Sequence, residues 1–297
     1  MLELTTIVVF PFNFISIIFH SFGIYCLHAQ KGGNRNQRIL LQNVSVIEIV
    51  KILYDYISFT SYYIYDTWYK KNQQLLDVIE VIIMTVIFFS FMMIDMERFF
   101  CITLNMKYKI YVTESLVKWV VFAVWMVGVA CGFVLWVGKD IISRKLYFYL
   151  VLGILVIVLT FITYSCILKT YHSSRRDFCH KSRNLRQELK ILRIPFLIIL
   201  GFLLFNIIPD VILFMLDETS NISEDMYHAS VILWAVGYLL DPLIYIFLNR
   251  KTRLVAKTTF QGMCKCAESL KNPKKIMNLN GWKRSRVRLK RHRETDF

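Results

Sequence analysis

The sequence predicts an all-α membrane protein in which seven transmembrane helices form a bundle and a short amphipathic helix follows the seventh. Of the 297 residues, 56% are hydrophobic and only 19% are charged, whereas about a quarter are charged in an ordinary soluble domain. The apolar residues gather in seven long runs, and the basic residues lie almost entirely between these runs and in the tail. A net charge of +15 distributed in this way indicates a membrane protein rather than a nucleic-acid-binding one.

The seven apolar runs have the length of membrane-spanning helices. A helix needs roughly 20 residues to cross a hydrocarbon core of ~30 Å, and lipid offers an open strand no hydrogen-bond partners. The first run has no basic start and is too long for a cleaved signal, so we expect a signal anchor. The expected spans are residues 7–27, 39–64, 75–104, 116–137, 146–170, 187–216 and 228–248.

The distribution of basic residues predicts the orientation of the spans. The gaps after the first, third and fifth spans with their flanking helix ends, together with the tail from Asn249, hold 30 of the 36 Lys and Arg residues. Short basic loops face the cytoplasm, so we expect an extracellular N-terminus and a cytoplasmic C-terminus in the cell membrane. The opposite face carries the loop "DETSNISED" with an N-glycosylation sequon, which predicts a glycan on Asn221.

The chain is expected to form one membrane domain, residues 1–266, followed by a basic cytoplasmic tail, residues 267–297. The segment "NRKTRLVAKTTFQGMCKC" interleaves apolar and basic residues, which is typical of an amphipathic helix on the inner leaflet. Cys264 and Cys266 at its end are candidate palmitoylation sites. The final basic run either binds anionic lipid or is simply solvated. None of the seven cysteines is expected in an outer loop, so a disulfide framework is not expected.

The third run places an acid and a base on one helix face. Eighteen residues separate Glu80 from Arg98, which is five whole helical turns and about 27 Å. Arg98 falls near the expected cytoplasmic end, where Glu97 supplies a counter-charge. Glu80 either reaches the outer water or anchors a cationic ligand in an apolar pocket. Asp77, nearly a turn higher, is the better interface residue.

The second run carries three ionisable residues at spacings of three and four. Glu48, Lys51 and Asp55 therefore share one side of the helix and can pair along it. Glu48 lies about 14 Å from the start of its span, near the bilayer midplane, so this side must face the bundle interior. The cluster is either a self-neutralised structural feature or a functional one.

The sixth and seventh runs each pair a proline with an acid. Pro209 precedes Asp210, and Asp241 precedes Pro242. Proline inside a helix frees a backbone carbonyl and permits a kink. An acid beside such a joint, at membrane depth, indicates a switch.

Taken together, these segments resemble rhodopsin-like (class A) G-protein-coupled receptors, of a divergent type. The motifs are "NVSVIE" in the second run, "MERFF" at the end of the third, Trp125 in the fourth, Tyr164 in the fifth, Pro209 in the sixth and "DPLIY" in the seventh. Their order and spacing match over about residues 7–266, and the combination is far more specific than any one motif.

The resemblance implies roles at the cytoplasmic end. Glu97-Arg98-Phe99 looks like the acidic-Arg-Tyr motif, whose arginine is held at rest and meets the G protein when the receptor is active. Tyr164 and Tyr245 look like the tyrosines that swing toward this arginine when the sixth helix moves outward. The residues implied in coupling and switching are Glu97, Arg98, Phe99, Tyr164, Pro209, Asp241, Pro242 and Tyr245.

The resemblance also implies roles deeper in the membrane. Glu48 takes the position of the family's sodium-binding aspartate, and Asp241 replaces the asparagine of the Asn-Pro-x-x-Tyr motif. We expect the Lys51 ammonium, one turn from Glu48, to stand in for the sodium ion, because two acids and one internal cation neutralise each other better than two acids alone. The expected charge network is Glu48, Lys51, Asp55 and Asp241. Glu80 matches the position at which aminergic receptors hold the ligand ammonium.

Several positions depart from the family pattern. His20 and Ser21 replace the usual asparagine of the first helix, and Gln73 replaces a disulfide cysteine. The sixth helix reads "NIIP", residues 206–209, and lacks the usual tryptophan. Ala235 stands where an opsin has its retinal lysine, which argues against light sensing. These departures imply a receptor with a non-standard trigger.

The expected function is therefore a receptor that binds an extracellular ligand, a cationic amine or basic peptide, and activates a heterotrimeric G protein. An apolar ligand is the alternative, because the expected pocket is rich in aromatic residues. An ion- or proton-coupled transporter or channel would also place acids at mid-membrane. A metal-dependent membrane hydrolase is disfavoured because the six histidines lack ligand spacing, so no enzyme activity, cofactor or metal is expected. The expected ligand-binding residues are Tyr62, Asp77, Glu80, Met84, Asp210, Phe214, His228 and Trp234.

Overall fold

The protein is all-helical throughout the part of the chain that the computed structural model describes, residues 2–30, 34–104, 107–137, 141–177, 196–217 and 224–271. Two compact units are distinguished, one ending at Thr252 and the other beginning at Arg253. The expected domain boundary at residue 266 stays a prediction. The first unit holds every feature discussed below except the exposed Cys264.

Three long helices open the chain: α1 (Leu2–Ala29), α2 (Arg35–Ile64) and α3 (Asp66–Thr103). The α2 helix begins where Asn34 adopts an extended backbone and its side chain accepts a hydrogen bond from the Asn36 amide. An asparagine at this position satisfies one of the free N–H groups of the first turn. The boundary between α2 and α3 is the single residue Tyr65.

The remaining helices are shorter or interrupted. A four-residue helix, α4 (Tyr108–Tyr111), precedes α5 (Glu114–Val137) and α6 (Ile141–Asp177). Residues 196–202 are helical and continue through a π-helical turn, η2 (Leu203–Ile207), into α8 (Ile208–Asp217). The last two are α9 (Glu224–Leu248) and α10 (Arg250–Lys271).

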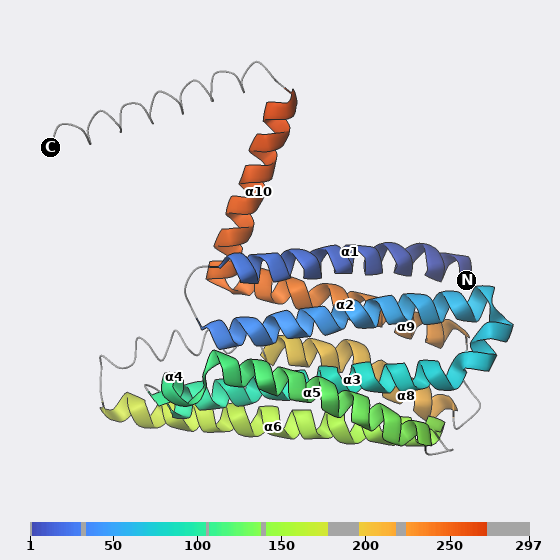
Figure 1. Cartoon of the computed structure of the whole chain (residues 1–297), viewed down its shortest axis with the longest axis horizontal. Helices are drawn as coiled ribbons and strands as arrows, with labels where there is room; N and C mark the ends of the chain where they lie inside the picture. The colour runs from blue at the N-terminus through green and yellow to red at the C-terminus, as the bar shows by residue number, and fades with distance from the viewer. Residues whose placement is uncertain are drawn as a thin grey trace. The chain divides into compact units, whose positions relative to one another are not determined.

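The α3 helix lies at the centre of the bundle. It packs against α2, α5 and α6, whereas α1 packs against α2 and α9, and α9 also contacts η2 and α8. Figure 1 shows these helices running side by side along their lengths. The apolar face of α3 includes Phe88, Phe91 and Ile94, each at most 1% exposed. Residues on α3 can therefore meet side chains from most of the bundle.

Six helices in the described ranges are long and apolar enough to cross a membrane, which identifies a multi-pass helical membrane protein. The expected count of seven is not reached, because α2 carries Glu48, Lys51 and Asp55 in its middle and is not among the six. Residues 187–195 of the sixth expected span lie outside the described part of the chain. The six segments are Val9–Ala29, Thr67–Thr103, Glu114–Val134, Tyr147–Cys166, Phe196–Leu213 and Ala229–Leu248.

A glycine allows α1 and α9 to approach closely. A Cβ atom on Gly23 would lie 2.1 Å from the hydroxyl oxygen of Tyr245 and 2.6 Å from its ring. Tyr245 is only 2% exposed, and its hydroxyl lies 2.9 Å from Ser45 Oγ on α2. The absence of a side chain at residue 23 thus makes room for the contact between Tyr245 and α2.

We predict that Gly23→Ala displaces Tyr245 and destabilises the bundle. Overpacking a filled core typically costs about 1–3 kcal/mol, which should lower the midpoint of thermal unfolding in detergent. Gly153→Ala is the matched control, because a Cβ there would lie at ordinary contact distances of 3.7 Å from Ile207 and 3.8 Å from Phe88. Equal melting temperatures for the two variants would contradict this account of the α1–α9 contact.

Candidate functional site

Glu97 and Arg98 form a buried ion pair near the C-terminal end of α3. The two residues are 4% and 3% exposed, and Arg98 Nε lies 2.7 Å from Glu97 Oε2. Neither atom makes a hydrogen bond within the described residues, so the attraction is between charges. Consecutive residues on a helix point in different directions, so the two side chains must bend toward each other to meet. The counter-charge expected for Arg98 is thus in place.

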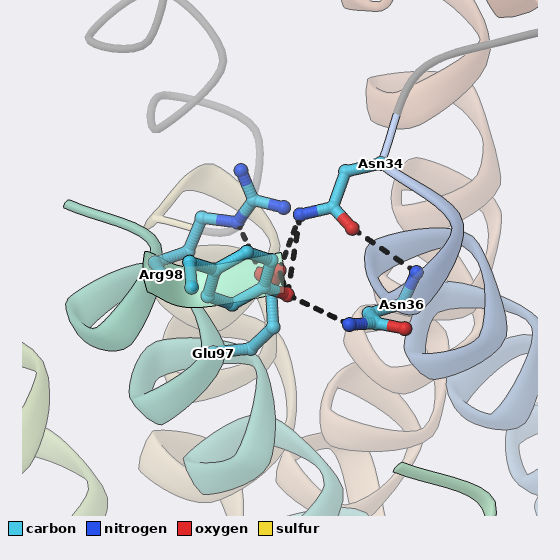
Figure 2. A network of polar contacts seen from close by, with 5 residues as sticks. Asn34, Asn36, Glu97 and Arg98 are labelled. Atoms are coloured by element: carbon cyan, nitrogen blue, oxygen red, sulfur yellow. Dashed lines mark hydrogen bonds and ion pairs between the residues drawn. The ribbon is translucent and has the colours of Figure 1, made fainter. Parts of the chain in front are cut away.

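Three further residues surround the Glu97 carboxylate, and together with the ion pair they form what we call the Glu97 cluster: Asn34, Asn36, Glu97, Arg98 and Tyr108. Asn34 Nδ2 and the Tyr108 hydroxyl both donate to Glu97 Oε1, each at 2.6 Å. Asn36 Nδ2 donates to the Tyr108 hydroxyl at 3.0 Å and to the backbone carbonyl of Val112 at 2.7 Å. Figure 2 shows Asn34 and Asn36 extending from the start of α2 toward the α3 pair.

Tyr108 is the donor that the cluster requires. Burial, followed by the neighbouring Glu97 carboxylate, raises the pKa of its phenol well above the usual value. The hydroxyl therefore keeps its proton and donates to Glu97. Hydrogen bonds to a charged acceptor are shorter and stronger than neutral ones. Nothing in the sequence marked Asn34, Asn36 or Tyr108 as functional, because they lie at the start of α2 and in the short helix α4, outside the motifs that the sequence offers.

The α6 side of the Arg98 guanidinium is also polar. Tyr164 lies within reach of the charges of Asp95 and Arg98, and its ring packs at 4.9 Å from that of Phe196. Thr160 Oγ1 donates to Asp95 Oδ2 at 2.5 Å. The charges of Asp95 and Arg98 therefore both act on Tyr164. The movement of Tyr164 toward Arg98 that the resemblance implies stays a prediction.

The Glu48 carboxyl group lies beside His20 and Asp241. His20 Nε2 lies 3.2 Å from Glu48 Oε2 and 2.9 Å from the backbone oxygen of Tyr238. A carbonyl only accepts, so Nε2 carries the proton. The Glu48 and Asp241 carboxyl groups lie within hydrogen-bonding reach of each other.

His20 lies beside the position that the resemblance assigns to a sodium ion. Its Nε2 proton is directed to the Tyr238 carbonyl, 2.9 Å away, while the same nitrogen lies 3.2 Å from Glu48 Oε2. Within the described ranges, no group of three or more His, Cys, Asp or Glu side chains is arranged to hold a metal ion.

Lys51 pairs with Asp55. Its ammonium forms an ion pair with Asp55 Oδ1 one turn along α2 and lies 5.4 Å from the centre of the Tyr54 ring. Tyr238 donates from its hydroxyl to the other Asp55 oxygen at 2.8 Å. Tyr238 therefore connects α9 to α2 through its side chain and to α1 through its carbonyl. The role expected of Lys51 as the cation near Glu48 and Asp241 stays a prediction.

The expected ligand-binding residues do not all come together. Glu80 and Asp77, both half-buried, and Asp55 lie near enough to Tyr54 for their charges to act on it. Met84 is buried at 3% exposure. Trp234 instead packs in the α1–α9 contact against a cluster that includes Val9. The side chains of four further expected residues lie outside the described part: Tyr62, Asp210, Phe214 and His228.

A polar contact joins α2, α3 and α5 within the bundle. Trp125 Nε1 donates to Asn43 Oδ1 at 3.0 Å, and Asn43 Nδ2 donates to Ser90 Oγ at 2.8 Å. The side-chain amide of Asn43 thus bonds to α5 through its oxygen and to α3 through its nitrogen. Trp125 belongs to the motifs of the family resemblance.

The sixth helix is irregular where the family motif is altered. Its π-helical turn includes Asn206, which is 4% exposed, and Pro209 follows at the start of α8. The ring of Phe202 packs against Phe88 and Phe91, with centroids 5.6 and 4.9 Å away. A π-turn frequently marks a functional position. Pro242 is buried inside α9, one residue after Asp241.

The expected modification sites are only partly described. Cys264 is exposed and free. Asn221 and the side chain of Cys266 lie outside the described residues. Phe99 is half-buried, and its ring packs edge-on against Phe100 at 5.8 Å.

No protein-family model matches the chain, and no curated protein matches it. We therefore infer the function from the residues described above.

We predict that Asn43→Ala weakens the contact between α2, α3 and α5. It leaves the Trp125 N–H and Ser90 hydroxyl without their present partner, and an unsatisfied buried polar group costs about 1–3 kcal/mol. Thermal unfolding in detergent should show this loss. Asn72→Ala is the control, since the Asn72 amide makes only an exposed bond to the Trp68 carbonyl within its own helix. A melting temperature unchanged by Asn43→Ala would remove this role.

Proposed function

We propose that the chain is a class A-like G-protein-coupled receptor of the cell membrane, with α2 as a seventh span, an extracellular N-terminus and a cytoplasmic C-terminus. The observation that carries this proposal is the buried Glu97–Arg98 pair at one end of α3, with a half-buried Glu80 five turns away at the other end. A buried ion pair contributes little net stability, so we assign this pair a role in switching between two states of the bundle.

Three other contacts support the same proposal. The Trp125–Asn43 bond, the Tyr245–Ser45 contact and the position of Tyr164 beside Arg98 all involve residues that the resemblance singles out. Each joins different helices of the bundle. They support the proposal because contacts between helices at these positions are what the resemblance leads us to expect.

The charges around Tyr54 favour a cationic ligand. Asp55, Asp77 and Glu80 lie near this ring, and Lys51 is the ammonium that pairs with Asp55. Acidic side chains gathered in this part of the bundle attract a cationic amine or basic peptide. The ligand acts by a population shift, because it binds better to the state whose inner end admits the G protein.

The alternative is an ion- or proton-coupled transporter or channel. The contact among His20, Glu48 and Asp241 favours it, since ionisable groups at membrane depth are a feature of such proteins. Flux measurements in proteoliposomes test this directly. Proton or cation flux without any stimulation of G proteins would replace the receptor proposal.

We predict that Arg98→Ala abolishes stimulation of G-protein nucleotide exchange by the chain reconstituted in nanodiscs. The loss should be at least tenfold, because no other side chain can supply the guanidinium at this position. Lys118→Ala is the control: it also removes a positive charge, but at a residue whose side chain is 62% exposed. Stimulation that is equal in the parent and in Arg98→Ala would refute the coupling role.

We predict that Glu80→Gln weakens responses to cationic agonists found by screening amines and basic peptides. A tenfold or greater rise in the half-maximal concentration is expected, equivalent to about 1.4 kcal/mol, because the neutral amide keeps the shape but loses the charge. Glu114→Gln changes an acid 27% exposed at the opposite end of the bundle and serves as the control. An unchanged response to every cationic agonist would remove Glu80 as the anchor.

A further inference from the structure

The Lys51 ammonium is held by the kinds of group that bind a cationic ligand. It forms an ion pair with Asp55 Oδ1 and lies 5.4 Å from the centre of the Tyr54 ring. A carboxylate supplies the opposite charge, and an aromatic face within about 6 Å attracts a cation through its ring electrons. The chain therefore places an ammonium of its own in surroundings suited to the ammonium of a ligand.

Three side chains make up these surroundings, which we call the Asp55 site: Tyr54, Asp55 and Tyr238. The Tyr238 hydroxyl, from α9, donates to Asp55 Oδ2 at 2.8 Å. The Tyr54 hydroxyl donates to the backbone carbonyl of Leu76, on α3, at 3.1 Å. Neither hydrogen bond involves Lys51, so these bonds hold the carboxylate and the ring whether or not the ammonium is present. The site is thus built by three helices and not by the spacing of two residues on α2 alone.

The Asp55 site adjoins the acid that we propose as the ligand anchor. The charge of Glu80 acts on both Tyr54 and Asp55. The Asp55 side chain is 21% exposed, whereas that of Lys51 is 10% exposed. An ammonium that approaches from beside Glu80 can therefore reach the Asp55 carboxylate, where it competes with Lys51.

The Lys51 ammonium has a second acid on its own helix. Glu48 precedes Lys51 by three residues and Asp55 follows it by four, so both acids are its neighbours on one side of α2. The lysine stem of four carbons is flexible. Lys51 can therefore leave Asp55 without leaving its charge unpaired inside the bundle, which would be strongly unfavourable.

We propose that the Asp55 site binds a primary ammonium group of an external ligand, and that Lys51 is a tethered competitor that occupies the site until the ligand displaces it. The role of this site in selecting the ligand rests on the proposed receptor function, whereas the binding of an ammonium does not. Because Lys51 is tethered, its ammonium binds without the loss of translational freedom that a free amine suffers. Removing the lysine should therefore open the site to simple amines.

The test removes the lysine and adds back the missing part. Lys51→Ala cuts the side chain after Cβ, and propylammonium has the size and charge of what is lost. The substitution should lower the midpoint of thermal unfolding in detergent, because Asp55 loses its cation. Propylammonium chloride at about 50 mM should then raise the midpoint of the variant by about 3 °C or more, and that of the parent by less than about 1 °C. No rise in the variant, or an equal rise in the parent, would overturn the proposal.

Two additives separate binding of the amine from effects of salt and solvent. Sodium chloride matches the ionic strength, and propanol matches the chain length without the charge. Neither should raise the midpoint of Lys51→Ala at the same concentration. A rise with either that equals the rise with propylammonium would overturn the proposal.

Lys118→Ala is the control for the loss of a paired lysine. Lys118 Nζ lies 2.9 Å from Glu114 Oε1, four residues earlier, and the Lys118 side chain is 62% exposed. Propylammonium should leave the midpoint of this variant unchanged, because solvent already surrounds the pair. A rise as large as in Lys51→Ala would mean that the amine acts wherever a lysine is lost, and it would overturn the proposal.

Asp55→Asn shows where the amine binds. In the Lys51→Ala background, asparagine keeps the shape of the side chain and an oxygen that can accept from Tyr238, but it has no charge. Propylammonium should then give no rise in the midpoint. Rescue that persists without the Asp55 carboxylate would place the amine elsewhere and would overturn the proposal.

Lys51→Met is the second variant, for the case in which Lys51→Ala does not fold. Methionine keeps an unbranched stem and lacks the charge, so the ammonium ion itself is the probe. Ammonium chloride should raise the midpoint of Lys51→Met by about 2 °C or more above the value in sodium chloride at the same concentration. Equal midpoints in the two salts would overturn the proposal.

The melting experiment needs no G protein, so the two proposals can fail separately. Rescue by propylammonium in a chain that stimulates no nucleotide exchange would end the receptor proposal and leave the Asp55 site intact. Stimulation of nucleotide exchange by the parent, without rescue in Lys51→Ala, would overturn the Asp55 site and leave the receptor proposal intact.

Discussion

A charged group that leaves water inside a helical bundle must find a partner, because an isolated ion in apolar surroundings costs many kcal/mol. The interior of this protein is arranged by that constraint. Arg98 meets Glu97, Lys51 meets Asp55, and His20 approaches Glu48. Two of these pairs form within one helix, and their remaining oxygens are bound from other helices. Packing among α1, α2, α3 and α9 is therefore tied to electrostatics as well as to apolar contact.

The polar contacts form two groups, one at the end of α3 and one in the middle of the bundle, and the two groups differ in how easily their backbone can move. At the end of α3, every donor to Glu97 comes from a connecting segment or a helix terminus, where the backbone can move without breaking a span. Deeper in the bundle, His20, Tyr238 and Asp55 link the middles of α1, α2 and α9, which are rigid elements. A rearrangement is therefore easier at the end of α3 than at mid-membrane, which is consistent with a switch at that end.

Local patterns explain what could be predicted and what could not. The apolar runs located six spans, and the spacing of Lys51 and Asp55 predicted a pair one turn apart, because helical periodicity acts over a few residues. The partner chosen for Glu48 was not predicted, since His20 precedes it by 28 residues on another helix. The contact of Tyr108 with Glu97 was not predicted either, because nothing in the sequence of a short connecting helix shows which side chain it will meet.

The sequence by itself determined the class of protein, the approximate spans and the residues that cannot be left unpaired in a membrane, because these follow from composition and from the period of a single helix. Only the tertiary structure decided which helices meet and hence which partner each charge obtains. The packing of α1 against α2 brings His20 to Glu48, and the packing of α2 against α3 brings Asn34, at the start of α2, to Glu97 near the end of α3. Contacts between helices depend on how each helix is rotated about its axis and how closely it approaches its neighbour. The spacing of residues along one helix does not determine either.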